Sequence, residues 1–160
     1  MTVKKSKALI IYDSLFGNTK KIAEAINDGL SNYYNSNLIS VKDIKPGDIE
    51  SIQLLVIGSP THGGNYSESV KAFFDTITDT SLKGVKTLAF DTSIPIEGQK
   101  RFMRMLIKML GYAAPRILKR LAKKGASTMG SESFWVLDRE GPLKEGETER
   151  ARKWVADLVR

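Results

Sequence analysis

Three short stretches, rich in glycine and in hydroxyl and amide side chains, each follow an apolar run. They cover residues 14–19, 58–64 and 91–94, and they contain most of the side chains that could bind a ligand. In sheets of parallel strands, ligands bind beyond the carboxyl ends of the strands, where such stretches meet. The sequence therefore predicts one composite site, of which the first stretch is the most informative part.

The first stretch, Ser14-Leu-Phe-Gly-Asn-Thr19, has the composition of an anion site. A helix is expected directly after it, and the unpaired N–H groups and the dipole of a helix N-terminus favour negative charge. Helix caps need the same residue types, so a helix capped by Asn18 or Thr19 without any ligand explains the pattern equally well. The residues alone leave both interpretations open.

The motifs of the commoner nucleotide sites do not occur in the sequence. It contains no G-x-x-x-x-G-K-[ST] for triphosphates, and no G-x-G-x-x-G follows the first apolar run. We therefore expect a monophosphate ester to be the natural ligand of the first stretch.

The chain has few side chains that could support metal or thiol chemistry. It contains no cysteine and a single histidine, His62, whereas zinc sites need several such ligands and iron–sulfur clusters need thiolates. We predict no metal site and no catalytic side chain, and redox chemistry would require an organic cofactor. His62 is either a solvated loop residue or a group that contacts a bound ring and supplies a proton near neutral pH.

Apolar runs alternate with helical patterns along the chain. Strands are predicted at residues 7–12, 37–41, 52–57, 85–90 and 133–137, with 126–129 as an alternative start of the last one. Helices are predicted around the apolar spacing of 22–33 and at 70–77, 98–110, 115–124 and 151–158. This alternation predicts a single α/β domain over residues 1–160, with a doubly wound sheet of five parallel strands and helices on both faces.

Length and composition agree with one globular domain. The 160 residues are 41% hydrophobic and 27% charged, and no apolar stretch approaches the 18 residues of a membrane span. The apolar run after MTVKKSK is too short for a secretory signal, so we expect a cytoplasmic protein.

Several segments resemble the flavodoxin family. Residues 12–19, Tyr-Asp-Ser-Leu-Phe-Gly-Asn-Thr, resemble the flavodoxin phosphate loop, whose pattern is [ST]-x-[ST]-G-x-T. Gly58-Ser-Pro-Thr-His-Gly-Gly64 resembles the second flavodoxin loop, and Phe90-Asp-Thr-Ser-Ile94 stands where the third is expected. The tail from Gly141 to Gly146, before the last helix, resembles short members of the family. The resemblance covers nearly the whole chain except residues 100–124.

The resemblance implies a flavodoxin-like strand order, 2-1-3-4-5, and non-covalently bound FMN. It implies that the phosphate contacts residues 14–19 and that residues 61–64 and 91–94 flank the isoalloxazine ring. In the family, a backbone carbonyl at the place of Gly63 accepts a hydrogen bond from the reduced ring. The cofactor-binding residues implied are Ser14, Leu15, Phe16, Gly17, Asn18, Thr19, Pro60, Thr61, His62, Gly63, Gly64, Asp91, Thr92, Ser93 and Ile94.

The function implied is electron transfer between redox partner proteins, a reductase and an acceptor. We expect an electron-transfer flavoprotein rather than a stand-alone oxidoreductase. An FMN-dependent NAD(P)H or quinone reductase is the alternative in the same class. A flavin-free interaction module that docks through residues 100–124 is the alternative from a different class.

The sequence departs from the flavodoxin pattern at several positions. Phe16 replaces a hydroxyl residue, His62 stands where many flavodoxins have tryptophan, and the third stretch contains no tyrosine. Tyr66 either supplies a ring contact in compensation or simply begins the next helix. The net charge of +7 contrasts with the acidic charge of typical flavodoxins, and it should ease full reduction of the flavin and suit acidic partners.

The basic charge belongs to one segment. Residues 100–124 contain nine Lys or Arg and no acid, so the remaining 16 basic and 18 acidic residues leave a net charge of −2. One interpretation is that the first helical piece, residues 98–110, is a core-facing helix with a solvated basic face. The other is an association surface for a second subunit in a homodimer, for an acidic partner, or for an anionic membrane surface. We expect no nucleic acid, because the basic residues have no interleaved aromatic platform.

Overall fold

The computed structural model describes residues 4–160, and its five strands form one parallel sheet in the order β2-β1-β3-β4-β5. The strands are β1 (Ser6–Tyr12), β2 (Tyr34–Ser40), β3 (Leu54–Pro60), β4 (Lys86–Ser93) and β5 (Ser127–Trp135). Each neighbouring pair is parallel. The doubly wound sheet and the order expected from the sequence are thus confirmed.

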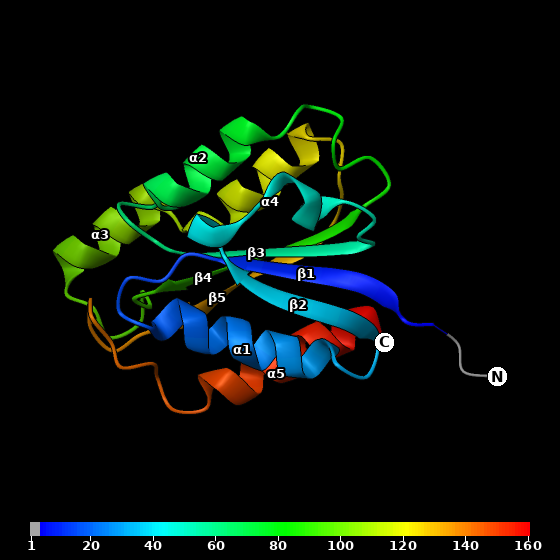
Figure 1. The fold of residues 1–160 in the computed structure, drawn as a ribbon. Coiled ribbons are helices and arrows are strands. Elements are labelled where there is room, and N and C mark those ends of the chain that lie inside the picture. The colour runs from blue at the N-terminus through cyan, green and yellow to red at the C-terminus, as the bar shows by residue number, and fades with distance from the viewer. Residues whose placement is uncertain (1–3) are drawn as a thin grey trace.

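Helices cover both faces of the sheet (Figure 1). One face carries α1 (Asn18–Leu30) and α5 (Glu147–Val159). The other carries α2 (Glu68–Thr76), α4 (Ala113–Lys123) and the short turns η1 (Val41–Asp43) and η2 (Pro46–Ile49). The remaining helix, α3 (Arg101–Leu110), lies at the end of the sheet where the strands finish. Among residues 4–160, no helix has both the length and the apolar character needed to cross a membrane.

Burial on both faces explains the continuous apolar runs of the central strands. In β1, Ala8 and Ile10 pack with α1 and α5, whereas Leu9 and Ile11 pack with α2 and α4. Successive side chains of a strand point to opposite faces, so a strand covered on both sides needs apolar residues at every position.

The two edge strands differ from the prediction. β2 begins at Tyr34 instead of residue 37. β5 covers Ser127–Trp135, so it begins within the alternative start at 126–129 and ends before residue 137. Most residues of both strands are only half-buried or exposed, so neither has the apolar run that marks a central strand. β4 also continues through Ser93, so most of the third stretch is strand and not loop.

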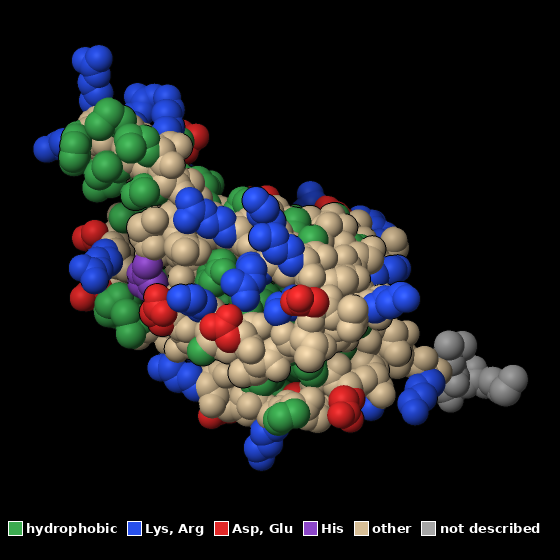
Figure 2. All heavy atoms as spheres, turned by 90° about the horizontal axis from the view of Figure 1, so that it is seen from above, with side chains coloured by type: hydrophobic (Ala, Val, Ile, Leu, Met, Phe, Trp, Pro, Cys, Tyr) green, Lys and Arg blue, Asp and Glu red, His purple; other side chains and the backbone are tan. Residues whose placement is uncertain are grey.

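The two helices of the basic segment are buried to very different degrees. α4 buries Ala113, Ala114, Ile117 and Leu121, as expected for a core-facing helix with a basic outer face. α3 has no buried residue, and Phe102 and Met109 are 68% and 72% exposed. Figure 2 shows hydrophobic side chains gathered on this projecting end of the molecule, with Lys and Arg around them. The core-facing interpretation is therefore wrong for α3.

Candidate cofactor site

A pocket opens at the carboxyl ends of β1, β3 and β4, and all three polar stretches contribute to its walls. The expected residues that line it are Ser14, Leu15, Phe16, Asn18, Thr19, Pro60, Thr61, His62, Thr92, Ser93 and Ile94. Val136 and Arg139, which follow β5, complete the lining. Four expected residues do not line it: Gly17, Gly63, Gly64 and Asp91. The fold thus brings most of the expected set together and adds one cation to it.

The first stretch leads into α1, but neither Asn18 nor Thr19 caps the helix. Gly17 is the N-cap, in the left-handed region at φ 91°, and no side chain of its own caps the helix. The Asn18 amide instead donates to the carbonyl of Glu140 at 3.1 Å. The Thr19 hydroxyl shares a 2.7 Å hydrogen bond with the hydroxyl of Thr92. Both side chains therefore join the first stretch to the other walls of the pocket.

Ser14 is the side chain that receives N–H groups at this helix end. Its Oγ accepts hydrogen bonds from the backbone N–H of Gly17 at 3.1 Å and of Lys20 at 3.2 Å. The N–H groups of Asn18 and Thr19 have no carbonyl partner within the helix, because they precede its first hydrogen bond. No acidic side chain lies in the first turn. The positive end of the α1 dipole at the pocket wall is thus not neutralised by an acid in that turn.

The second stretch folds into a tight two-residue turn. His62 and Asn65 exchange backbone hydrogen bonds of 2.8 and 3.0 Å, and Gly63 and Gly64 between them have φ values of 54° and 79°. This is the backbone that glycine adopts without strain. A Cβ on Gly64 would lie 2.2 Å from the carbonyl oxygen of Leu110 in α3, whereas a Cβ on Gly63 would meet no described atom within 4 Å. The two glycines are therefore needed for different reasons.

We expect Gly64→Ala to lower the free energy of unfolding by at least about 2 kcal/mol more than Gly63→Ala does. Both substitutions place a side chain in the left-handed region, which costs about 1–2 kcal/mol, and only Gly64→Ala adds a clash with backbone. Urea denaturation of the two variants measures the difference. Equal losses of stability would show that the contact between this turn and α3 relaxes freely.

Asp91 lies beneath the pocket. Its carboxylate is fully buried and accepts three hydrogen bonds. The donors are the Ser93 hydroxyl at 2.7 Å, the Ala114 backbone N–H at 2.8 Å and the Ser133 hydroxyl at 3.0 Å. Burial raises the pKa of Asp91 from 3.8 to about 6, an increase that the hydrogen bonds only partly offset. This carboxylate joins β4, β5 and the start of α4, and so it supports the pocket without lining it.

The start of α4 is also bonded to two pocket walls. The Ala113 N–H donates to the Thr61 hydroxyl at 3.0 Å, and the Tyr112 hydroxyl donates to the Ile94 carbonyl at 3.4 Å. The Tyr112 ring lies 5.6 Å from that of Trp135. An aromatic pair therefore stands behind the third stretch, although that stretch contains no aromatic residue.

Tyr66 packs edge-on against Phe74 of α2, with ring centroids 5.6 Å apart, and does not line the pocket. It precedes Ser67, the N-cap of α2, so it neither lines the pocket nor begins the helix. His62 lines the pocket and is exposed to solvent. Within residues 4–160 there is no group of three His, Asp or Glu side chains placed to hold a metal ion.

Comparison with known proteins gives a family match over most of the chain. The family model described as Flavodoxin matches residues 10–154. Among curated proteins, the probable flavodoxin 1 of Bacillus subtilis is 33% identical over 87 residues, which are 53% of this chain and 55% of that protein. The chain spans about half the length of the curated relatives that it matches.

Solved structures of flavodoxins share the fold. Oxidised flavodoxin 1 from Bacillus cereus superposes with a TM-score of 0.73 at 18% identity, over 96% of this chain and 97% of that one. A flavodoxin from the domain Archaea gives a TM-score of 0.70 at 21% identity, over 96% of each chain. At these identities, the likeness shows the fold alone.

Proposed function

Because the chain belongs to the flavodoxin family, we propose that it binds FMN in the pocket of the three stretches and carries electrons between redox proteins. Proteins of this family bind FMN, which confirms the cofactor expected from the sequence. The convergence of the stretches at the ends of β1, β3 and β4 is the observation that carries the proposal. Nothing in the family match supports a stand-alone NAD(P)H or quinone reductase or a flavin-free module.

The first stretch fits the phosphate of FMN. The N-terminus of α1 offers the N–H groups of Asn18 and Thr19, and the Ser14 hydroxyl stands beside them as a donor or acceptor. Gly17 has open space where a Cβ would be, so nothing there obstructs an approaching anion. Lys20 in the first turn and Arg139 in the pocket wall add positive charge.

Leu15 and Phe16, together with the second and third stretches, fit a flat ring with one apolar and one polar side. Leu15 and Phe16 line the pocket and are 64% and 44% exposed, so they offer apolar surface that a ring would cover. FMN bound there would accept and release one or two electrons. We assign Thr61, His62 and residues 92–94 to the edges of the ring. Gly63 and Gly64 do not line the pocket and continue the turn beside it. The open position of Gly63 leaves its peptide free to reorient and present its carbonyl.

The partner proteins in this proposal are a reductase and an acceptor. The cytoplasmic location stays a prediction. The exposed side chains of Leu15, Phe16 and His62 lie at the mouth of the pocket, so a partner can approach the flavin there. The net charge of +7 favours partners with acidic surfaces.

The test is the redox behaviour of the purified, FMN-loaded protein. We expect the visible absorption of oxidised flavin at one FMN per chain, reduction by a one-electron donor, and rapid reoxidation by a one-electron acceptor. Steady-state oxidation of NAD(P)H by the protein alone, with a quinone as acceptor, would contradict the carrier proposal and favour a reductase. A colourless protein that takes up no FMN would favour the interaction module.

A further inference from the structure

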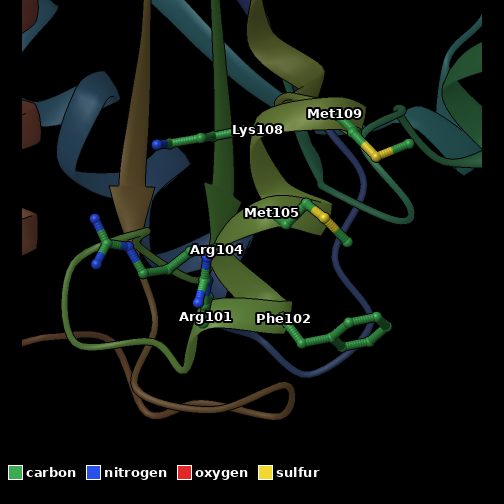
Figure 3. Close-up of a pocket in the computed structure, with 6 residues that line it drawn as sticks. All are labelled: Arg101, Phe102, Arg104, Met105, Lys108 and Met109. Atoms are coloured by element: carbon green, nitrogen blue, oxygen red, sulfur yellow. The ribbon is translucent and has the colours of Figure 1, made fainter.

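α3 presents two adjoining stripes of side chains to solvent. In Figure 3, the basic side chains point to one side of the helix and the apolar ones to the other. The basic residues are Arg101, Arg104 and Lys108, and the apolar residues are Phe102, Met105 and Met109. All six are exposed, and the apolar three stand at the i, i+3, i+7 spacing of one helix face. A contiguous exposed apolar patch of this kind marks a binding surface.

The C-terminal end of α3 contacts two other segments of the chain. The Arg116 guanidinium donates to the carbonyl of Leu110 at 2.6 Å, which satisfies one of the last carbonyls of α3. The Gly64 backbone packs against the same carbonyl from the other loop. α3 is therefore anchored at its C-terminal end, and its exposed apolar face covers no part of the protein core.

Within α3 and α4, every charged side chain is basic. None of the nine cations of residues 100–124 has an acidic neighbour within that segment. Arg120 of α4 pairs with Asp75, and Lys124, directly after α4, pairs with Asp79. Arg116, Lys119 and Lys123 remain exposed. The face seen in Figure 2 accordingly carries many basic side chains over α3 and α4. A complementary partner must present negative charge and apolar volume together.

We propose that α3 docks the protein on a membrane surface that contains anionic lipid. Phe102, Met105 and Met109 would enter between the headgroups, while the three cations of the adjoining stripe contact lipid phosphates. A helix with an apolar face, a basic polar face and no acid is the pattern that lies in a bilayer interface. The proposal does not depend on FMN, because no residue of the cofactor pocket belongs to this face.

A second copy of the chain fits this face less well. In an antiparallel twofold pair of α3 helices, the apolar stripes would meet and the basic stripes of both copies would lie along the same edge. The cations of one copy would then lie close to those of the other, with no acid on the helix to neutralise them. A bilayer supplies negative charge and apolar volume to both stripes at once.

Docking through α3 would also place the second stretch near the lipid. Gly64 touches the last residue of α3, so the turn of His62 to Asn65 lies beside the docked helix. The pocket mouth would then open close to the membrane surface.

Vesicle sedimentation of the full chain tests the proposal. We expect binding to vesicles of phosphatidylcholine mixed with phosphatidylglycerol, little binding to phosphatidylcholine alone, and a steep decrease with added salt. Replacing Arg101, Arg104 and Lys108 by Gln should lower partitioning about 100-fold, at about fivefold for each cation. Replacing Phe102, Met105 and Met109 by Ser should lower it at every salt concentration. None of these side chains is buried, so the fold tolerates both triple variants.

The matched control removes the same charge at the opposite end of the sheet. Lys7→Gln, Lys83→Gln and Lys86→Gln together also lower the net charge by three, and all three side chains are exposed. We expect this variant to bind anionic vesicles nearly as well as the wild type. A loss equal to that of the α3 variant would show that net charge alone drives binding, which would overturn the proposal.

Other results would assign α3 a different occupant. A wild-type protein that ignores both kinds of vesicle but forms a dimer, which the Ser variant dissociates, would show that a second copy covers this face. A monomeric protein that binds neither kind of vesicle would indicate that a different protein binds this face. Either result would overturn membrane docking.

Discussion

FMN is expected to bind the apoprotein at least about 100-fold more tightly than riboflavin, because the phosphate adds two or more charge-assisted hydrogen bonds of about 1.5–3 kcal/mol each. The two ligands share the ring and differ only in the phosphate. The N–H groups of Asn18 and Thr19 and the Ser14 hydroxyl are the donors that we assign to it. With riboflavin bound, the two N–H groups would donate to water, and Ser14 would keep only its hydrogen bonds within the loop.

Fluorescence titration of apoprotein with both ligands measures this ratio. Lys20→Glu should weaken FMN about tenfold and leave riboflavin unchanged, since it reverses one charge in the first turn of α1. Lys71→Glu, an equivalent reversal on α2, is the matched control and should affect neither ligand. Equal affinities for FMN and riboflavin would show that the first stretch does not bind the phosphate.

A second large effect is expected at Asp91. Its pKa of about 6 lies above the ordinary 3.8, so the folded protein binds this proton more tightly than the unfolded chain does. The resulting contribution to stability is complete below about pH 4 and is lost as the pH rises through 6. Its size is roughly 3 kcal/mol, by the conversion of pKa shifts into free energy.

Asp91→Asn should remove this pH dependence. We expect the free energy of unfolding of the variant to rise relative to the wild type by roughly 3 kcal/mol between pH 4 and pH 7. The opposite contribution of Glu147, whose pKa is lowered by Arg150 and the Trp135 N–H despite partial burial, is common to both proteins and cancels. Asp75→Asn, at an exposed acid, controls for the change of net charge. Parallel stability curves for wild type and Asp91→Asn would mean that water reaches Asp91.

The residues that follow the strands could be predicted from the sequence, whereas the other residues around the pocket depend on the tertiary structure. Glycine and hydroxyl residues directly after apolar runs marked the strand ends that line the pocket. Arg139, Val136 and Tyr112 were missed because they reach the site from segments with no local signal. Asp91 was expected beside the ring because composition does not show that a strand continues through it and turns its side chain inward.

The α3 helix shows a different limit of the sequence. Its apolar spacing correctly predicted a helix with an apolar face, since periodicity reports which side chains share a face. Periodicity does not report what covers that face. The neighbouring α4 has a similar pattern and buries its apolar side against the sheet, whereas α3 leaves Phe102 and Met109 in solvent.

NMR mapping of backbone amides can show whether FMN lies among the three stretches at the ends of β1, β3 and β4. Isotope-labelled apoprotein is titrated with FMN and, separately, with riboflavin. We predict the largest amide shifts in residues 14–19, 61–64 and 92–94, with those of 14–19 much reduced for riboflavin. Shifts confined to a different cavity, lined by Ile44, Ile49 and Phe73 between η1, η2 and α2, with residues 14–19 unmoved, would show that FMN binds elsewhere.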